Sequence, residues 1–180
     1  MARNIEIKAR IDDMDVLSRR VAALADQGPT EIEQDDTFFV CANGRLKLRI
    51  FGDRTGELIF YRRADESGPK ESFYLRSPTA APDDLHETLT LAYGQAGRVR
   101  KRRTVFLVGR TRVHLDRVEG LGDFLELEVV LKDGEPPDVG VREAEELLGL
   151  LGLGAGQLVR GAYVDLEERD GVGVRGINGC

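Results

Sequence analysis

The stretches NIEIKARI (residues 4–11) and GRLKLRI (residues 44–50) carry the clearest structural signal in this chain. In both, apolar and charged side chains alternate strictly, which is the period-2 pattern of a β-strand with one buried face. The polar face of each predicted strand therefore holds mostly charged side chains, with Asn4 as an uncharged member in the first. The charged side chains are Glu6, Lys8 and Arg10 in the first stretch, and Arg45, Lys47 and Arg49 in the second.

Outward from these stretches, the same alternation predicts about eight strands, separated by turns and a few helices. Short connections between consecutive strands favour antiparallel pairing, and eight such strands can close into a barrel. The expected fold class is α+β: an eight-stranded antiparallel β-barrel with a tunnel and helices packed outside. We expect one domain over residues 1–168 and a flexible, Gly-rich tail over 169–180. Strands are expected near residues 4–11, 36–42, 45–50, 57–63, 71–76, 98–108, 111–118 and 124–131, and helices at 14–25, from 82 to about 94 and around 144–151.

The composition of the chain argues against some classes of binding partner. The 180 residues include 26 Lys+Arg and 32 Asp+Glu, for a net charge of −6, which argues against nucleic acid or a membrane surface as a partner. No apolar run approaches the roughly 20 residues of a membrane span, and the N-terminus lacks a signal-peptide core. Cys41 and Cys180 are too few for a disulfide framework. We expect a cytoplasmic protein.

The charged faces have a simple explanation and a functional one. An antiparallel sheet with one wet face places charges there without any further role. However, these faces hold almost only Arg, Lys, Asp and Glu, with acids on the first and last strands and bases between them. A lumen lined by Arg and Lys needs an anionic occupant, and clustered carboxylates in it need a divalent cation. Together these groups predict chemistry on a polyphosphate.

The sequence resembles the CYTH family of triphosphate tunnel metalloenzymes, which includes class IV adenylyl cyclases and thiamine triphosphatases. The family signature Glu-x-Glu-x-Lys appears near the N-terminus, where Glu6 and Lys8 match and Asn4 replaces the first Glu. Three further stretches resemble the family's basic and acidic strands, and the resemblance extends to about residue 166. They are GRLKLR (44–49), VRKRR (99–103) and FLELE (124–128).

The resemblance implies an enzyme that needs Mg²⁺ or Mn²⁺ and acts on a triphosphate compound such as ATP, inorganic triphosphate or thiamine triphosphate. It implies that Lys8 is catalytic or holds phosphate, although a plain ion pair with a neighbouring glutamate is the simpler role. Arg160 lies beside a segment that resembles the family's tunnel-closing segment, so we add it to the phosphate-binding set. That set is Lys47, Arg49, Arg63, Lys101, Arg103 and Arg160, and the expected metal ligands are Glu6, Asp116, Glu126 and Glu128.

The reaction itself stays open between alternatives. The stretches 3–10 and 114–122 look most like the class IV adenylyl cyclase branch, in which the 3′-hydroxyl of ATP attacks the α-phosphorus and pyrophosphate leaves. The alternatives are an inorganic or organic triphosphatase and a non-catalytic polyphosphate or nucleotide sensor. Because the Asn4 amide is a weaker metal ligand than a carboxylate, we expect one cation to be held well and a second poorly.

Three further features stay open. His114 is expected to be solvated or hydrogen-bonded rather than catalytic, and Tyr163 to pack in the core or touch substrate. The head group of the substrate has no sequence signal. A homodimer is one option, since a partner could complete an open seam in the barrel.

Overall fold

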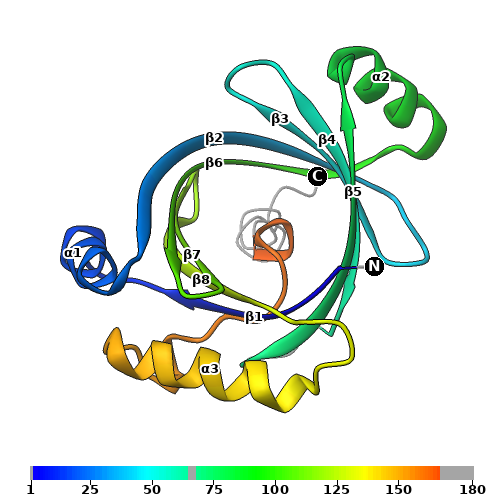
Figure 1. The fold of residues 1–180 in the computed structure, drawn as a ribbon. Coiled ribbons are helices and arrows are strands. Elements are labelled where there is room, and N and C mark those ends of the chain that lie inside the picture. The colour runs from blue at the N-terminus through cyan, green and yellow to red at the C-terminus, as the bar shows by residue number, and fades with distance from the viewer. Residues whose placement is uncertain (1, 65–67, 167–180) are drawn as a thin grey trace, which may run out of the picture.

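The computed structural model describes residues 2–64 and 68–166. In these residues eight strands form a closed antiparallel barrel in the order β1-β5-β4-β3-β2-β6-β7-β8, with the helices outside (Figure 1). The predicted fold class is therefore confirmed. The strands are β1 (Ala2–Arg10), β2 (Gln27–Phe39), β3 (Arg45–Phe51), β4 (Gly56–Arg63), β5 (Lys70–Thr79), β6 (Gln95–Val108), β7 (Thr111–Val118) and β8 (Gly122–Val130); the helices are α1 (Met14–Leu24), α2 (Pro82–Tyr93), α3 (Pro137–Leu150) and the short η1 (Ala155–Gln157).

The barrel closes within one chain, because β1 pairs with β5 on one side and with β8 on the other. An open seam, which was the sequence argument for a second copy, is not present among the described strands. The predicted tail over 169–180 lies outside the described residues. Among the residues that are described, no helix is both long and apolar enough to cross a membrane.

Strand β2 is longer than the sequence predicts, since it begins at Gln27 rather than near residue 36. Its first half is mostly exposed, so it lacks the apolar alternation that marks a half-buried strand. Backbone pairing with β6 holds this half in place, with Thr30 opposite Val105 and Glu33 opposite Arg102. Pairing between strands far apart in the chain therefore extends β2 beyond its local signal.

The main hydrophobic core lies outside the barrel wall, between the sheet and helices α1 and α3 (Figure 1). Because side chains alternate along each strand, this placement leaves the other face of every strand to line the lumen. Helix α3 packs closely: a Cβ at Gly140 would lie 2.7 Å from Ile5 Cγ1. The buried core side chains on β1, β7 and β8 are Ile5, Ile7, Val113, Leu115, Leu125, Leu127 and Val129.

The C-terminal segment, residues 158–166, enters the barrel and closes the lumen at one end (Figure 1). Its Val159 N–H donates to the Lys8 carbonyl at 2.9 Å, and its Asp165 carboxylate accepts two hydrogen bonds from Arg45. A Cβ at Gly97 would overlap with Val164 Cγ2, so this close approach requires glycine. The segment then packs on the inner apolar side chains at this end of the barrel.

Candidate active site

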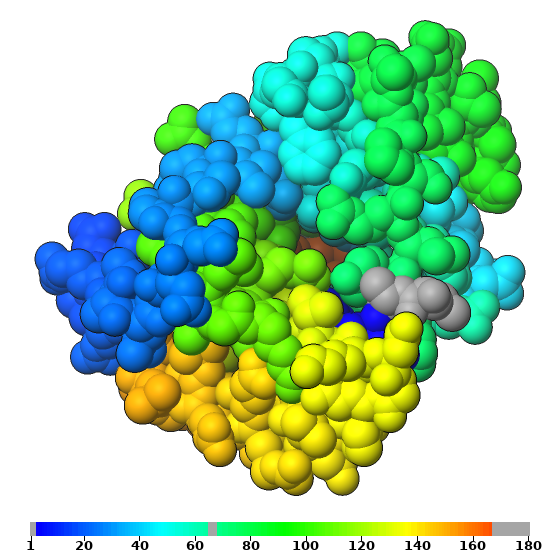
Figure 2. Space-filling view, in the orientation of Figure 1, coloured from blue at the N-terminus to red at the C-terminus, as the bar shows by residue number. Residues whose placement is uncertain are grey.

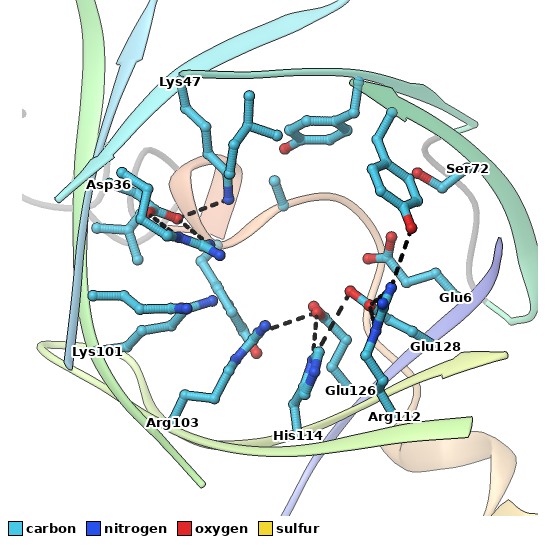
Figure 3. A pocket seen from close by; sticks show the side chains of 18 of the residues that line it. Glu6, Asp36, Lys47, Ser72, Lys101, Arg103, Arg112, His114, Glu126 and Glu128 are labelled. Atoms are coloured by element: carbon cyan, nitrogen blue, oxygen red, sulfur yellow. Dashed lines mark hydrogen bonds and ion pairs between the residues drawn. The ribbon is translucent and has the colours of Figure 1, made fainter. Parts of the chain in front are cut away.

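The lumen contains a cavity of about 330 Å³ lined by side chains from all eight strands and from the C-terminal segment. In Figure 2 the cavity opens as a hollow on the face turned to the viewer, and parts of β1 and of the C-terminal segment are visible at its bottom. Two sides of this cavity differ in their charged groups (Figure 3). One side is mainly cationic and holds Lys47, Lys101 and Arg103 around Asp36, and the other holds the three glutamates together with the cations that pair with them, Arg112 among these. The glutamates are Glu6, Glu126 and Glu128.

Asp36 organises one half of the cationic side. Its carboxylate accepts hydrogen bonds from Lys47 Nζ at 2.7 Å and from Arg49 Nε and Nη2 at 2.7 and 2.8 Å. Burial alone would raise the pKa of Asp36, but Arg49 and Lys47 outweigh it and hold this pKa far below its ordinary value. Burial, together with Arg49, lowers the pKa of Lys47 to about 8. Asp36 is thus a buried counterion that holds two cations at the lumen.

Asp116 organises the other half. It is fully buried, accepts two hydrogen bonds from Arg103 at 2.7 and 2.6 Å and one from the Tyr163 hydroxyl at 2.8 Å, and lies 3.3 Å from Lys101 Nζ. Burial would raise its pKa, but Arg103 and Lys101 hold that pKa well below its ordinary value. Burial, together with Arg103, lowers the pKa of Lys101 to about 7.

This placement differs from the metal ligand that the sequence predicts at Asp116. Its two oxygens are occupied by Arg103, Lys101 and Tyr163, and it has no exposed surface from which to reach an ion in the cavity. We therefore describe Asp116 as the anchor of the cationic side. Arg160 also differs from the prediction, because it is exposed and does not line the cavity.

Two carboxylates and an imidazole form a cluster on the acidic side. Ligand atoms of His114, Glu126 and Glu128 all lie within 4.8 Å of one another. His114 Nδ1 lies 3.4 Å from Glu126 Oε1 and 3.9 Å from Glu128 Oε1 (Figure 3). Glu126 also faces Lys8 Nζ at 3.2 Å and Arg103 Nη2 at 3.1 Å, so it joins the acidic side to the cationic side.

The donor set of this cluster fits a divalent cation. Burial would raise the pKa of Glu126, yet Lys8 and Arg103 hold it well below its ordinary value, so the carboxylate is ionised. Burial and Arg103 lower the pKa of His114, which favours the neutral imidazole that can bind a metal. Carboxylate oxygens suit Mg²⁺ and Mn²⁺.

The sequence did not single out His114 as a ligand. The signal that could have found it is the register of β7 and β8, which places His114 directly opposite Glu126.

Glu6 and Asn4 line the cavity beside this cluster. Glu6 is directly opposite Glu128 in the β1–β8 register, and its carboxylate accepts a hydrogen bond from Arg63. Arg63, an expected phosphate ligand, therefore lies against an expected metal ligand. The Oδ1 atom of Asn4 is buried and has no hydrogen-bond partner.

Lys8 lies at the boundary of the two sides. It is 3% exposed, and its Nζ lies 4.0 Å from the centroid of the Tyr163 ring as well as 3.2 Å from Glu126. Tyr163 thus packs in the closed end of the lumen and contacts both Lys8 and the Asp116 anchor. The structure brings together every predicted site residue except Asp116, which lies behind the lining, and Arg160.

The outer face of β6 carries the arginines that the sequence places away from the lumen. Arg98 and Arg100 pair with Asp35, and Arg102 pairs with Glu33, all on the surface. The basic run over residues 98–103 is therefore divided between two faces, as its alternation predicts.

Comparison with known proteins gives the family. The CYTH domain family model matches residues 2–163. The chain belongs to the CYTH family. It is 27% identical over 172 residues, which cover 92% of this chain and 88% of the relative, to adenylate cyclase CyaB of Aeromonas hydrophila.

Two solved structures share the fold. The PH1012 protein from Pyrococcus horikoshii OT3 has a TM-score of 0.81 at 24% identity, covering 91% of this chain and 98% of that one. HpAC1 from Hippeastrum, an assigned adenylyl cyclase described as having a dominant triphosphatase activity, has a TM-score of 0.64 at 20% identity, covering 93% of this chain and 96% of that one. As a CYTH member, the chain falls among adenylyl cyclases and triphosphatases.

Proposed function

We propose that this CYTH protein is a divalent-metal-dependent enzyme that acts on a triphosphate compound in the barrel lumen, and that it is most like a class IV adenylyl cyclase. One observation carries the proposal: buried cations on one side of the lumen adjoin a cluster of two carboxylates and an imidazole on the other (Figure 3). A triphosphate chain with its cation matches this division, because phosphate oxygens bind to the cations and share the metal with the carboxylates.

The proposed phosphate ligands are Arg49, Lys47, Lys101 and Arg103, together with Arg63, which lines the cavity from its position against Glu6. Arg49 and Arg103 are each held by a buried aspartate through two hydrogen bonds, so their positions are set before substrate arrives. Preorganised donors of this kind stabilise charge that develops on phosphate oxygens without having to reorient.

The cation would be held by Glu126, Glu128 and His114, with Glu6 next to them. When bound, it would neutralise charge on the phosphate oxygens, including those of the leaving group. We assign Mg²⁺ or Mn²⁺ to this set because it is rich in carboxylate oxygen and adjoins the phosphate ligands, and Mg²⁺ is typically bound by one or two carboxylates together with phosphate oxygens.

Lys8 is the proposed catalytic residue. Its Nζ lies between Glu126 and the Tyr163 ring. At this point the metal cluster adjoins the proposed phosphate ligands named above, which we call the phosphate clamp. A phosphate group that contacts both the metal cluster and the phosphate ligands would lie beside this ammonium group. The ammonium group would then stabilise the negative charge that develops on that phosphate group.

The cyclase and the triphosphatase differ in the attacking oxygen. In the cyclase, the 3′-oxygen of ATP bonds to the α-phosphorus, the bond from that phosphorus to the β-phosphate oxygen breaks, and pyrophosphate leaves. In the triphosphatase, a water oxygen bonds to the terminal phosphorus, the bond from that phosphorus to the neighbouring phosphate breaks, and the products are orthophosphate and the remaining diphosphate compound, which is the leaving group. The name of the Aeromonas relative, at 27% identity, favours the first. The activity described for HpAC1 makes the triphosphatase the second candidate.

Product analysis tests the proposal. The protein is incubated with ATP, inorganic triphosphate or thiamine triphosphate, each with Mg²⁺ or Mn²⁺. Cyclic AMP with pyrophosphate supports the cyclase, and release of orthophosphate supports the triphosphatase. Binding of these compounds without any turnover contradicts the proposal and indicates a sensor.

The matched variants are Glu126→Gln and Glu145→Gln. Glu126→Gln removes a charge from the proposed metal cluster, so we expect turnover to fall by more than about 100-fold, since even outer-shell changes at metal sites cost about 10–100-fold. Glu145 is exposed on α3, and its substitution should leave turnover unchanged. Full activity of Glu126→Gln contradicts the metal assignment.

A further inference from the structure

One part of the lumen wall has a character different from that of the ionic sides. Ile32 and Gln34 on β2, Phe51 on β3 and Val105 on β6 all line the cavity, yet none of them is charged. They are contiguous across the sheet: Gln34 is directly opposite Phe51, and Ile32 is opposite Arg103, two residues from Val105. We call these four residues the amide patch.

Gln34 carries an unpaired polar atom. The residue is 5% exposed, and its Oε1 is buried without a hydrogen-bond partner. Its cross-strand neighbour on β6 is Lys101, whose ammonium lies against Asp116 instead. A buried acceptor without a donor is costly, so this oxygen is a position where a donor from a bound molecule is favoured.

Phosphate cannot supply that donor. The oxygens of an ionised triphosphate chain only accept hydrogen bonds, and the cations beside Gln34 already suit them. The unpaired Oε1 therefore points to a different part of the ligand, one that carries an N–H group.

The three apolar members of the patch lie outside the hydrophobic clusters of the described residues. Ile32, Phe51 and Val105 are only partly buried, and within the described residues none of them belongs to the three hydrophobic clusters of the protein. Covering such apolar surface with a flat apolar group is favourable, because this removes the surface from water.

We propose that the amide patch is the head-group subsite of this enzyme, and that it binds a flat nitrogen-containing aromatic ring with an amino group beside a ring nitrogen, as adenine presents. Gln34 Oε1 accepts from the amino group, the Gln34 amide nitrogen donates to the ring nitrogen, and the ring packs on Phe51 and Ile32. The proposal rests on the proposed function, because the patch adjoins the phosphate clamp: Asp36, which holds Lys47 and Arg49, is two residues from Gln34 on the same face of β2.

The test compares three ligands by calorimetry, in EDTA so that metal-dependent turnover is stopped. ATP carries the amino group, purine riboside 5′-triphosphate lacks it, and inorganic triphosphate has no head group. We expect the wild-type protein to bind ATP about tenfold more tightly than purine riboside triphosphate, because a buried acceptor loses its donor in the second complex.

Gln34→Leu should abolish that tenfold difference and leave the affinity for inorganic triphosphate unchanged. Its melting temperature should equal or exceed that of the wild type, because an apolar group replaces an unpaired buried amide. Gln27→Leu is the matched control: Gln27 is exposed on the same strand, and its substitution should change none of the three affinities.

Phe51→Leu tests the stacking surface independently. It should weaken ATP and purine riboside triphosphate equally, by about fivefold, without effect on inorganic triphosphate. Phe60→Leu, on the outer face of β4 beside Arg62, should affect none of them.

Two results overturn the subsite. One is equal binding of ATP and purine riboside triphosphate by the wild type; the other is a loss for Gln34→Leu that is as large for inorganic triphosphate as for ATP. Failure of inorganic triphosphate to bind at all is a separate result, which contradicts the proposed function rather than the subsite alone.

Discussion

Two pairs of acidic residues in the lumen differ in what surrounds them. Asp36 and Asp116 each accept two hydrogen bonds from one arginine and pair with a lysine as well. Glu126 and Glu128 also pair with cations, but they lie next to each other and to His114, so three possible metal ligands meet at the cavity. All four are on inward-facing strand positions, so the sequence pattern alone does not separate them. We infer from this difference that a carboxylate surrounded only by cations and a hydroxyl anchors them, whereas carboxylates that meet one another and an imidazole can also bind a metal.

Strand register decides between these two places. Asp36 is directly opposite Arg49, and Asp116 is directly opposite Arg103, so each short aspartate meets a long arginine across the sheet. Glu126 is directly opposite Lys8 on one side and His114 on the other, and Glu128 is opposite Glu6 and Arg112. Direct cross-strand pairs interact most strongly, so these contacts follow from the register.

The largest expected effect is on stability, at the anchor. Asp116→Asn leaves Arg103 and Lys101 buried without their counterion, so the free energy of unfolding should fall by about 3–5 kcal/mol. Chemical denaturation followed by circular dichroism measures it. Asp35→Asn is the control, because its partners Arg98 and Arg100 are half exposed and such pairs contribute at most about 1 kcal/mol. A loss below about 1 kcal/mol for Asp116→Asn would remove the anchor role.

The next effect is on metal activation. Glu128→Gln should raise the Mn²⁺ concentration needed for half-maximal turnover by about tenfold or more, because one charged donor of the cluster is lost. Asp123→Asn, a substitution on the same strand outside the cavity lining, serves as the control and should leave the requirement unchanged. An unaltered Mn²⁺ requirement in Glu128→Gln would contradict the division between anchors and metal ligands.

A third effect concerns protons. With pKa values lowered to about 7 and about 8, Lys101 and Lys47 are largely neutral in the free protein at pH 8.5. A bound polyanion favours the ammonium form and raises both pKa values, so triphosphate binding should take up protons, at most about one per lysine. Calorimetry in two buffers of different ionisation enthalpy measures the uptake. Lys101→Met should reduce it and exposed Lys132→Met should not; binding without proton uptake at this pH would contradict the account.

The smallest effect is expected at the closed end of the lumen. Tyr163→Phe removes the hydroxyl that donates to Asp116 but keeps the ring against Lys8, so stability should fall by about 1 kcal/mol. Because Arg103 keeps both bonds to Asp116, KM for the triphosphate should rise only about two- to threefold, with kcat nearly unchanged. Tyr93→Phe, at an exposed position of α2, is the control. A loss of kcat with unchanged KM would indicate that Tyr163 contacts the reacting groups instead.

The sequence predicts the barrel and its two faces well, because alternation is a local property of each strand. It places Lys47, Lys101 and Glu126 inward and Arg102 outward, as the structure has them. It does not reveal the start of β2, which depends on pairing with β6.

Contacts inside the site also depend on pairing between strands, which the sequence of a single strand does not predict. The anchor role of Asp36 and the place of His114 beside Glu126 depend on which residues lie opposite across the sheet, and that register follows from the closed barrel rather than from any one strand. Arg160 was expected near phosphate from its neighbours in the chain, but its side chain is exposed and does not line the cavity.

The most direct measurement is the position of a bound metal. Crystals grown with Mn²⁺ and inorganic triphosphate, with diffraction recorded at the manganese absorption edge, locate the ion without assumption. We expect an anomalous peak within coordination distance of Glu126 and Glu128, with the phosphate groups extending toward Arg49, Lys101 and Arg103. A manganese ion bound at Asp116, or found only outside the lumen, would contradict the metal assignment.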